Sequence, residues 1–329
     1  MIEFKIEELE FFSKELKFNT ELKLFLNTYF DSFSTKMTPY NKILWFKNLF
    51  LLAKHDLSTA HCLQHHSMAH LILNIGLDKK LTRSPKNIDN MIGCYSGYKK
   101  LDTVVINDNN TIKGQKYWTS LLDESDYAVF QVLNTKNEKT YIYFYLNEIN
   151  YKINFDHFDP IGMVTANPGV FIIENDIDIS NNILGNAESS DFFLTKNFHN
   201  YCFITNFLAC SISLLEQLEI YCLENKINAE YLIKKHKLEL SSLKLMWLDN
   251  LETINIDNLS DEFWHKRNTQ YVNGKKMINE IVSTVLTVGS SLFLDKHSKF
   301  SQKFRDALML CSHQGTLFDD IINQNFLKI

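Results

Sequence analysis

The chain has 329 residues, 45% of them hydrophobic, so it can bury a large core and hold one large domain or two to three small ones. Its net charge of −5 is spread without long runs of one sign, which argues against a nucleic-acid partner because such partners usually need a basic face. The acidic, amphipathic start predicts no signal peptide, and no window approaches about 18 uninterrupted apolar residues, so no membrane span is expected. Six scattered cysteines without a Cys-x-x-Cys pair predict reduced thiols in a cytoplasmic protein.

Residues 1–89 are predicted to form a helical domain. Apolar residues recur at helical spacing over 3–34, which predicts two helices. A third helix is expected from Pro39 to about residue 54, because proline is favoured at the first helical position. A fourth is expected to follow a cap at Asp56 or Ser58 and to end near residue 76.

The fourth predicted helix carries four histidines, His61, His65, His66 and His70. They form two pairs spaced four apart, a spacing that can place two imidazoles on one metal. The two pairs point roughly 140° apart on a helix, and no His-Glu-x-x-His arrangement follows. We therefore predict no metal site and interpret the histidines as residues that flank a core.

Residues 90–188 are predicted to form a β-domain, and 189–329 a second helical domain. In the β-domain the apolar period falls from about 3.6 to 2. Five strands at this spacing predict a small barrel or sandwich. The predicted strands are 103–107, 111–118, 127–133, 140–146 and 169–175, and the predicted C-terminal helices are 199–224, 227–250, 260–296 and 300–325.

Within the β-domain, Gly114, Lys116, Trp118 and Ser120 occupy alternate positions. In an extended chain they share one face of a sheet. Such a face suits the wall of a pocket that stacks a flat ring and offers it a hydrogen bond. The alternative is an ordinary β-hairpin with a half-exposed tryptophan.

This Gly-x-Lys-x-Trp-x-Ser pattern, followed by Ser125-Asp126, resembles the middle β-domain of the acyl-CoA dehydrogenase superfamily. The resemblance implies an α+β fold with an N-terminal helical domain, a middle β-barrel or sandwich and a C-terminal four-helix bundle. It implies FAD as cofactor, with Trp118 packed on the flavin ring, Ser120 hydrogen-bonded near its N5, and Thr119 between them. It also implies a homodimer or homotetramer, because in this family the flavin bridges subunits.

Further motifs resemble the family but depart from it. Arg305-Asp306 and Gln314-Gly315 resemble its Arg-Asp…Glu-Gly-Thr motif, whose Glu removes the α-proton of an acyl thioester. Gln314 cannot accept that proton, because a carboxamide has no basic lone pair near neutral pH. The alternative base position of the family corresponds to His199, and the following Asn200 replaces an arginine that contacts the flavin pyrophosphate.

Other parts of the family's cofactor site are changed or reduced. Of its Gln-x-x-Gly-Gly segment only Gly289 is kept. Its Thr-Glu-Pro…Gly-Ser-Asp loop is replaced by residues 94–102, whereas Gly162-Met163 still resembles its Leu-Gly-Met turn. By the same resemblance, Arg305 and Gly289 belong to the cofactor-binding residues.

These departures leave three hypotheses for the function. The first is a divergent FAD-dependent oxidoreductase acting on an acyl thioester, with Gln314 at the usual base position and His199 as a substitute base. The second is a same-fold flavin-dependent monooxygenase that acts on a small molecule, with His313 near the flavin. The third is a non-catalytic descendant that serves as a binding or scaffold protein. A heterologous subunit that supplies the missing base would reconcile the losses with activity.

Overall fold

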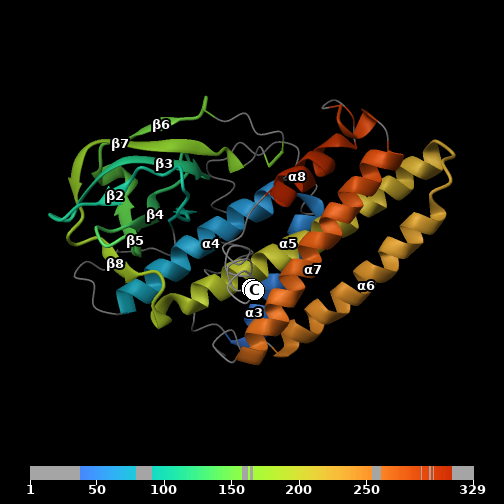
Figure 1. The fold of residues 1–329 in the computed structure, drawn as a ribbon, viewed down its shortest axis with the longest axis horizontal. Coiled ribbons are helices and arrows are strands. Elements are labelled where there is room, and N and C mark those ends of the chain that lie inside the picture. Colours follow the sequence, from blue (N-terminus) through green and yellow to red (C-terminus); the bar gives the residue numbers. More distant parts are fainter. Residues whose placement is uncertain are drawn as a thin grey trace, which may run out of the picture.

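The computed structural model describes residues 38–78, 91–157, 162–163, 166–253, 261–289, 291–295, 298 and 300–312. The helices predicted over 3–34 lie outside this part of the chain, as do His313 and Gln314. A sheet occupies one end of the molecule and a helical bundle the other, and two long helices, α4 and α5, run from one to the other (Figure 1).

Two helices open the described chain, α3 (Pro39–His55) and α4 (Leu57–Asp78). The side chain of Thr38 caps α3, and Asp56 caps α4 by accepting from the backbone N–H of Ser58 and Thr59. Both predicted starts are confirmed. The predicted end at Gly76 is wrong, because α4 continues to Asp78. A Cβ on Gly76 would lie 2.7 Å from Cδ2 of Leu184, so this glycine allows α4 to approach the sheet.

The β-domain contains all five predicted strands. One sheet has the order β6-β7-β3-β2-β4-β5-β8, and β1 pairs in parallel with β4 outside this path. The strands β1, β6 and β8 were not predicted. The strands are β1 (Gly93–Ser96), β2 (Val105–Ile106), β3 (Thr111–Thr119), β4 (Tyr127–Leu133), β5 (Lys139–Tyr145), β6 (Lys152–Asn154), β7 (Gly169–Asp178) and β8 (Ile183–Asn186).

The second helical block is built around α5 (Phe193–Glu224), which begins six residues before its predicted start. It packs against α3, α4, α6, α7 and α8. Its neighbours in sequence are α6 (Glu230–Thr253), α7 (Asp261–Val288) and α8 (Ser301–Ser312). Short 3-10 turns lie at Leu146–Glu148, Ser190–Phe192 and Ser291–Phe293.

Among the described helices, the stretch Ser190–Glu224 is the one that is long and apolar enough to cross a membrane by length and composition alone. In its most apolar window, 83% of the residues are buried inside the protein. This burial is that of a core helix. The large aromatic residues Trp45 and Phe46 of α3 pack against Phe198 and Tyr201 of α5 and join the two helical blocks into one core.

Candidate functional site between the sheet and the helices

Strand β3 loses its regular alternation at Trp118. This residue has a left-handed φ of 53°, and the register with β7 shifts between Lys116 and Thr119. A bulge of this kind redirects a side chain. The indole of Trp118 is 36% exposed, whereas Lys116 and Thr119 are fully buried. The prediction that Lys116 and Trp118 share one face is therefore wrong, because the bulge turns Trp118 away from the interior.

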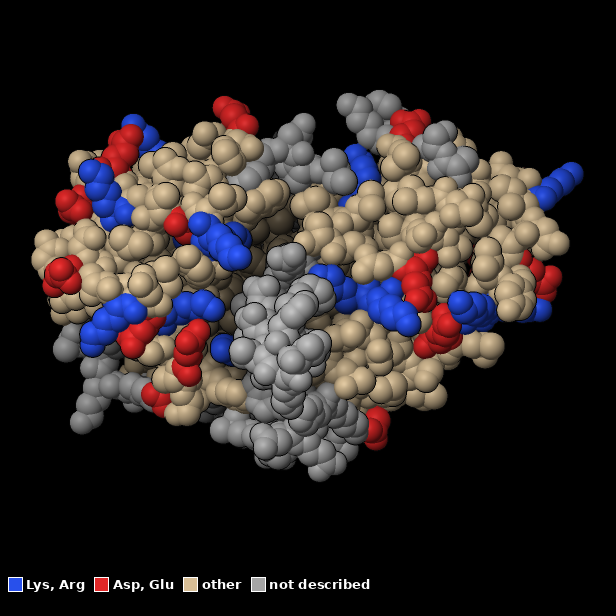
Figure 2. All heavy atoms as spheres, viewed as in Figure 1, with Lys and Arg blue, Asp and Glu red and all other residues tan. Residues whose placement is uncertain are grey.

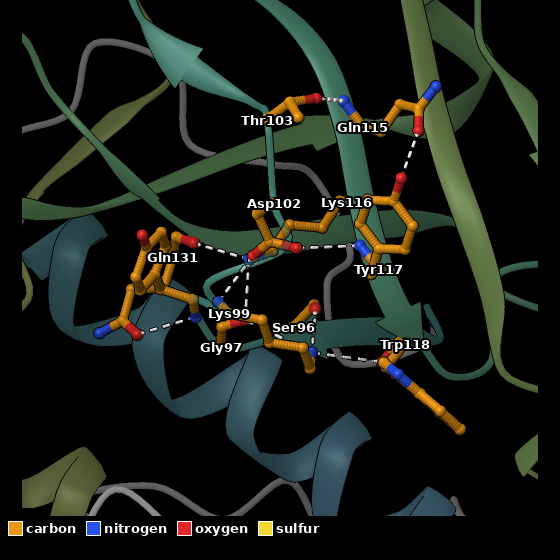
Figure 3. Close-up of polar contacts among 11 residues, drawn as sticks. Ser96, Gly97, Lys99, Asp102, Thr103, Gln115, Lys116, Tyr117, Trp118 and Gln131 are labelled. Carbon is orange, nitrogen blue, oxygen red and sulfur yellow. Dashed lines mark hydrogen bonds and ion pairs between the residues drawn. The ribbon is translucent and has the colours of Figure 1, made fainter. Parts of the chain in front are cut away.

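Lys116 points into the β-domain and forms a buried ion pair with Asp102 (Figure 3). Its Nζ also donates to the backbone oxygens of Gly97, at 2.7 Å, and Gln131, at 2.9 Å. Burial lowers the pKa of Lys116 to about 7, nearby Lys99 acts in the same direction, and Asp102 opposes both. Lys116 is thus not the pocket wall that the alternation predicted. It attaches the loop of residues 97–102 to β3 and β4.

The same loop places a second lysine beside Trp118. Nζ of Lys99 donates to Oγ of Ser96 at 3.1 Å and to the backbone oxygen of Trp118 at 3.4 Å (Figure 3). Burial lowers the pKa of Lys99 to about 8, against the effect of Asp102. The sequence of this loop showed only that the family motif is lost, so Lys99 was not predicted as a site residue. The nearest signal was the pair of lysines at 99 and 100.

The histidines of α4 bind the free edge of β1. Since β1 pairs with β4 on one side, its other backbone groups need partners. His65 Nδ1 donates to the oxygen of Tyr95 at 2.9 Å, and His70 Nε2 donates to the oxygen of Met91 at 3.1 Å. His66 Nδ1 accepts from the backbone N–H of Gly93 at 3.2 Å. Three histidines of α4 therefore hold the helix against β1 and the residues just before it.

His199, on the first turns of α5, is held in one tautomer. Oε1 of Gln64 accepts from Nδ2 of Asn206 at 3.0 Å, so Nε2 of Gln64 donates to Nδ1 of His199 at 3.2 Å. The hydrogen of the neutral ring is then on Nε2. Burial, with His61 and Lys99, lowers the pKa of His199 to about 3. His199 is therefore neutral near pH 7 and offers an N–H donor.

His65 offers the complementary group. Because its Nδ1 donates to Tyr95, its Nε2 carries a lone pair, and this buried atom has no partner in the described part of the chain. The rings of His65 and His199 each lie 5.9 Å from the ring of Tyr95, and the ring of His61 lies 4.3 Å from that of His65. The donor on His199 and the acceptor on His65 thus belong to two rings that both lie beside Tyr95.

The imidazole cluster, defined as His61, His65 and His199, lies close enough to the cation Lys99 to be influenced by it. Burial lowers the pKa of His61 to about 4 and that of His65 well below its usual value. Lys99 and the neighbouring histidines also lower these pKa values, and among the described residues no carboxylate shifts them. Buried titratable groups with such shifts are typical of functional sites. On the face shown in Figure 2, the surface is hollowed between the sheet and the bundle.

No known protein-family profile matches this sequence, and no curated protein matches it. Solved structures do. The fold is similar to glutaryl-coenzyme A dehydrogenase in its glutaryl-CoA complex, with a TM-score of 0.69 and 10% identity over 89% of this chain and 81% of that one. Butyryl-CoA dehydrogenase from Megasphaera elsdenii has a TM-score of 0.67 and 10% identity, over 87% and 82%. The HsaA monooxygenase from M. tuberculosis has a TM-score of 0.66 and 12% identity, over 87% and 82%.

The chain has the acyl-CoA dehydrogenase fold. The fold class predicted from the sequence, helical block, β-domain and helical bundle, is thereby confirmed. Both kinds of neighbour suggested by the sequence motifs, dehydrogenases and same-fold monooxygenases, are among these structures. At this level of identity the likeness establishes the fold alone.

In the acyl-CoA dehydrogenase fold, a flavin would lie with its ring beside Trp118 and Thr119, and these residues fit a flavin ring. Oγ1 of Thr119 is fully buried and has no partner among the described residues, and it follows the outward-facing Trp118 directly. A buried polar atom without a partner is rare in a folded protein. At the other end, the amide of Asn197 and Oδ1 of Asn200 are also buried without described partners. These amides can hydrogen-bond a pyrophosphate, but they bring no positive charge to it.

Two further predicted cofactor residues make hydrogen bonds within or beside their helices. Nη2 of Arg305 donates to Oε1 of Gln302 within α8, and the backbone N–H of Gly289, just after α7, donates to the oxygen of Val285. A Cβ on Gly162 would lie 2.3 Å from the backbone oxygen of Arg305, so the Gly-Met turn needs its glycine for this approach.

The aspartate of the Arg-Asp motif completes that contact. Oδ1 of Asp306 accepts from the backbone N–H of Met163 at 2.6 Å and from Nε2 of Gln302 at 2.9 Å. Burial raises the pKa of Asp306 to about 7. The motif therefore joins α8 to the β-domain, a role that sequence comparison did not predict.

Proposed function

We propose that this protein is a flavin-dependent oxidoreductase that uses FAD and acts on an acyl thioester. The observation that carries the proposal is the segment Trp118–Ser120. There a bulge presents an indole beside a fully buried hydroxyl, that of Thr119, without a described partner. Trp118 would pack on the flavin ring, and Thr119 and Ser120 would hydrogen-bond its polar edge. The bound flavin supplies the hydride acceptor.

The imidazole cluster would handle the substrate. The Nε2–H of His199 is available to donate to the thioester carbonyl oxygen, which polarises the carbonyl and acidifies the neighbouring α-carbon. The lone pair on Nε2 of His65 is the acceptor for the α-proton. Its lowered pKa makes His65 a weaker base than a free imidazole, so we expect slow turnover. Gln314 would orient the substrate without taking the proton.

A same-fold monooxygenase is the second candidate, and one observation favours it. Among the described residues, no carboxylate shifts the pKa values of the imidazole cluster. Reaction of reduced flavin with oxygen needs no α-proton base, so a site of neutral imidazoles serves it as well. His313 would then lie near the flavin. This activity needs a separate flavin reductase.

We further propose a cytoplasmic homodimer or homotetramer. The flavin-bridged subunit arrangement is taken from the family resemblance. A heterologous subunit that supplies the missing base is the alternative assembly.

The visible absorption spectrum of purified protein, before and after incubation with FAD and desalting, tests the cofactor. We expect a flavin band that is retained by wild type and by Leu101→Ala, a control at an exposed loop position, and lost in Trp118→Ala. Stacking on an aromatic ring contributes substantially to the binding of a flat ligand. Absence of the band in wild type with FAD in excess would instead favour the non-catalytic descendant.

Anaerobic mixing of the flavin-loaded protein with acyl-CoA thioesters then tests the substrate. Bleaching of the flavin band is expected in wild type. It should slow by about 100-fold or more in His65→Gln, because a positioned base contributes on the order of 10²–10⁴ in rate. The exposed His157 provides the control variant His157→Gln. Oxygen consumption by chemically reduced protein, without bleaching by any thioester, would select the monooxygenase.

A further inference from the structure

A cluster of metal-binding side chains lies on α6 and α7, in the part of the bundle away from the sheet (Figure 1). His236 and Glu239 come from α6, and Glu280 comes from α7. One ligand atom from each residue lies within 4.8 Å of the other two. His236 is only 3% exposed, whereas the two carboxylates are partly exposed. A buried nitrogen ligand thus faces two oxygen ligands that a solvated ion can reach.

Thr284 is positioned to orient the ring of His236. Oγ1 of Thr284 lies 2.9 Å from the backbone oxygen of Glu280, to which it can donate. The same Oγ1 lies 2.9 Å from Nε2 of His236, and while it donates to Glu280 it is an acceptor for a hydrogen on that nitrogen. With the ring hydrogen on Nε2, the lone pair of the neutral ring is on Nδ1, which lies 3.3 Å from Oε2 of Glu239.

When the hydrogen is on Nε2, Nδ1 of His236 and Oε2 of Glu239 are both acceptors, and a cation between them can bind to both. The neighbouring lysines do not occupy this position. Lys235 and Lys276 approach the other oxygens, Oε1 of Glu239 and Oε1 of Glu280, at 3.8 and 3.7 Å, near the outer limit for an ion pair. The ligand atoms of His236, Glu239 and Glu280 are therefore close enough together to bind one metal ion.

We propose that His236, Glu239 and Glu280 bind a divalent transition-metal ion of the Zn²⁺ type, separate from the proposed flavin site. One imidazole with carboxylates suits Zn²⁺, whereas Mg²⁺ and Ca²⁺ prefer sites made of oxygen alone. A metal-bound histidine usually donates its second ring N–H to a fixed acceptor, and Thr284 is that acceptor. Two carboxylates balance the charge of the ion, and water completes a tetrahedral site. The ion ties α6 to α7.

The test is a Zn²⁺ titration of untagged, chelator-treated full-length protein. Calorimetry measures the stoichiometry and affinity of binding, and thermal unfolding measures the midpoint with and without zinc. Because other histidines can bind zinc weakly, the readout is the difference between variants. We expect wild type to bind one more Zn²⁺ per chain than Glu280→Gln, and zinc to raise the midpoint of wild type more than that of Glu280→Gln. Glu280→Gln keeps the shape of the side chain, so it also serves where His236→Gln fails to fold.

Two more variants sharpen the result. Thr284→Val removes the acceptor that orients His236, and should weaken zinc binding by about 10- to 100-fold. Glu230→Gln removes an exposed carboxylate of the same helix that pairs with Lys234, and should bind like wild type. Equal stoichiometry and affinity in wild type and Glu280→Gln would overturn the proposal, as would wild type that binds no zinc.

Discussion

At the scale of single residues, the candidate site depends on how buried imidazoles are oriented. The chain from Asn206 through Gln64 fixes the hydrogen of His199 on Nε2, while the backbone of β1 fixes that of His65 on Nδ1. His199 is thus a hydrogen-bond donor at Nε2, and His65 an acceptor at Nε2, before any ligand binds. Their burial also couples them to folding, because a group whose pKa differs between folded and unfolded states makes stability depend on pH.

His199→Gln should reduce the acid sensitivity of the protein. The pKa of His199 falls from 6.5 to about 3 on folding, so between these values the unfolded chain binds the extra proton. Stability contributed by the neutral ring is complete above pH 6.5 and is lost as the pH falls. Between pH 7 and pH 5 wild type should lose about 2 kcal/mol more than the variant. Urea unfolding at both pH values measures this.

The control for that experiment is His157→Gln, because His157 is exposed to solvent in the folded protein. It should lose as much stability on acidification as wild type does. If His199→Gln did the same, the burial of a neutral imidazole at position 199 would be contradicted.

At the scale of elements, the loop of residues 97–102 is held by a buried charge pair. Lys116 and Asp102 lie in the interior, and their hydrogen bonds reach β3, β4 and the loop itself. Because the loop also carries Lys99 to the carbonyl of Trp118, its attachment positions part of the candidate site.

Lys116→Met should destabilise the protein by about 3–5 kcal/mol, because it leaves the carboxylate of Asp102 buried without its counter-ion. The double variant Lys116→Met/Asp102→Asn should recover part of that loss, since no charge is then buried. Lys152→Met breaks an exposed pair with Glu174 and should change little. Urea midpoints rank the variants. A double variant less stable than Lys116→Met would contradict a buried ionic pair.

The strands and helices of this chain were predictable where a pattern extends over several turns or alternations. The long strands β3, β4, β5 and β7 and the helices after residue 190 were predicted from their period, although α5 begins six residues before its predicted start. The bulge at Trp118 was not predictable, because a left-handed φ at a tryptophan has no local sequence signal. Without the bulge, alternation assigns Lys116 and Trp118 to one face. Burial of Lys116 depends on Asp102, a partner 14 residues away.

At the scale of the whole molecule, α5 joins the sheet to the bundle. It brings His199 to Tyr95 of β1 and to Gln64 of α4, residues 104 and 135 positions earlier in the chain. The order of elements, together with the resemblance of residues 114–120 to the acyl-CoA dehydrogenase family, was enough to predict the fold. The imidazole cluster was not predictable, since only the folded chain brings His199 of α5 to His61 and His65 of α4.

The outer helix α6 presents an apolar stripe at seven-residue spacing. Tyr231, Leu238 and Leu245 are 79%, 75% and 68% exposed. This spacing is that of helices which pack against another helix. We expect a second copy of the chain to cover the stripe, in keeping with the proposed homo-oligomer.

Leu238→Lys/Leu245→Lys should therefore shift the protein towards monomer. Burying a leucine contributes about 1.5–3 kcal/mol, so losing two such contacts should raise the dissociation constant on the order of 100-fold or more. Light scattering after size-exclusion chromatography, over a range of concentrations, measures the mass. Leu101→Lys places the same charge at a position on the β-domain that is 65% exposed, and should keep the wild-type mass. An unchanged mass in the α6 variant, or a wild type that is monomeric at every concentration, would show that the stripe faces solvent.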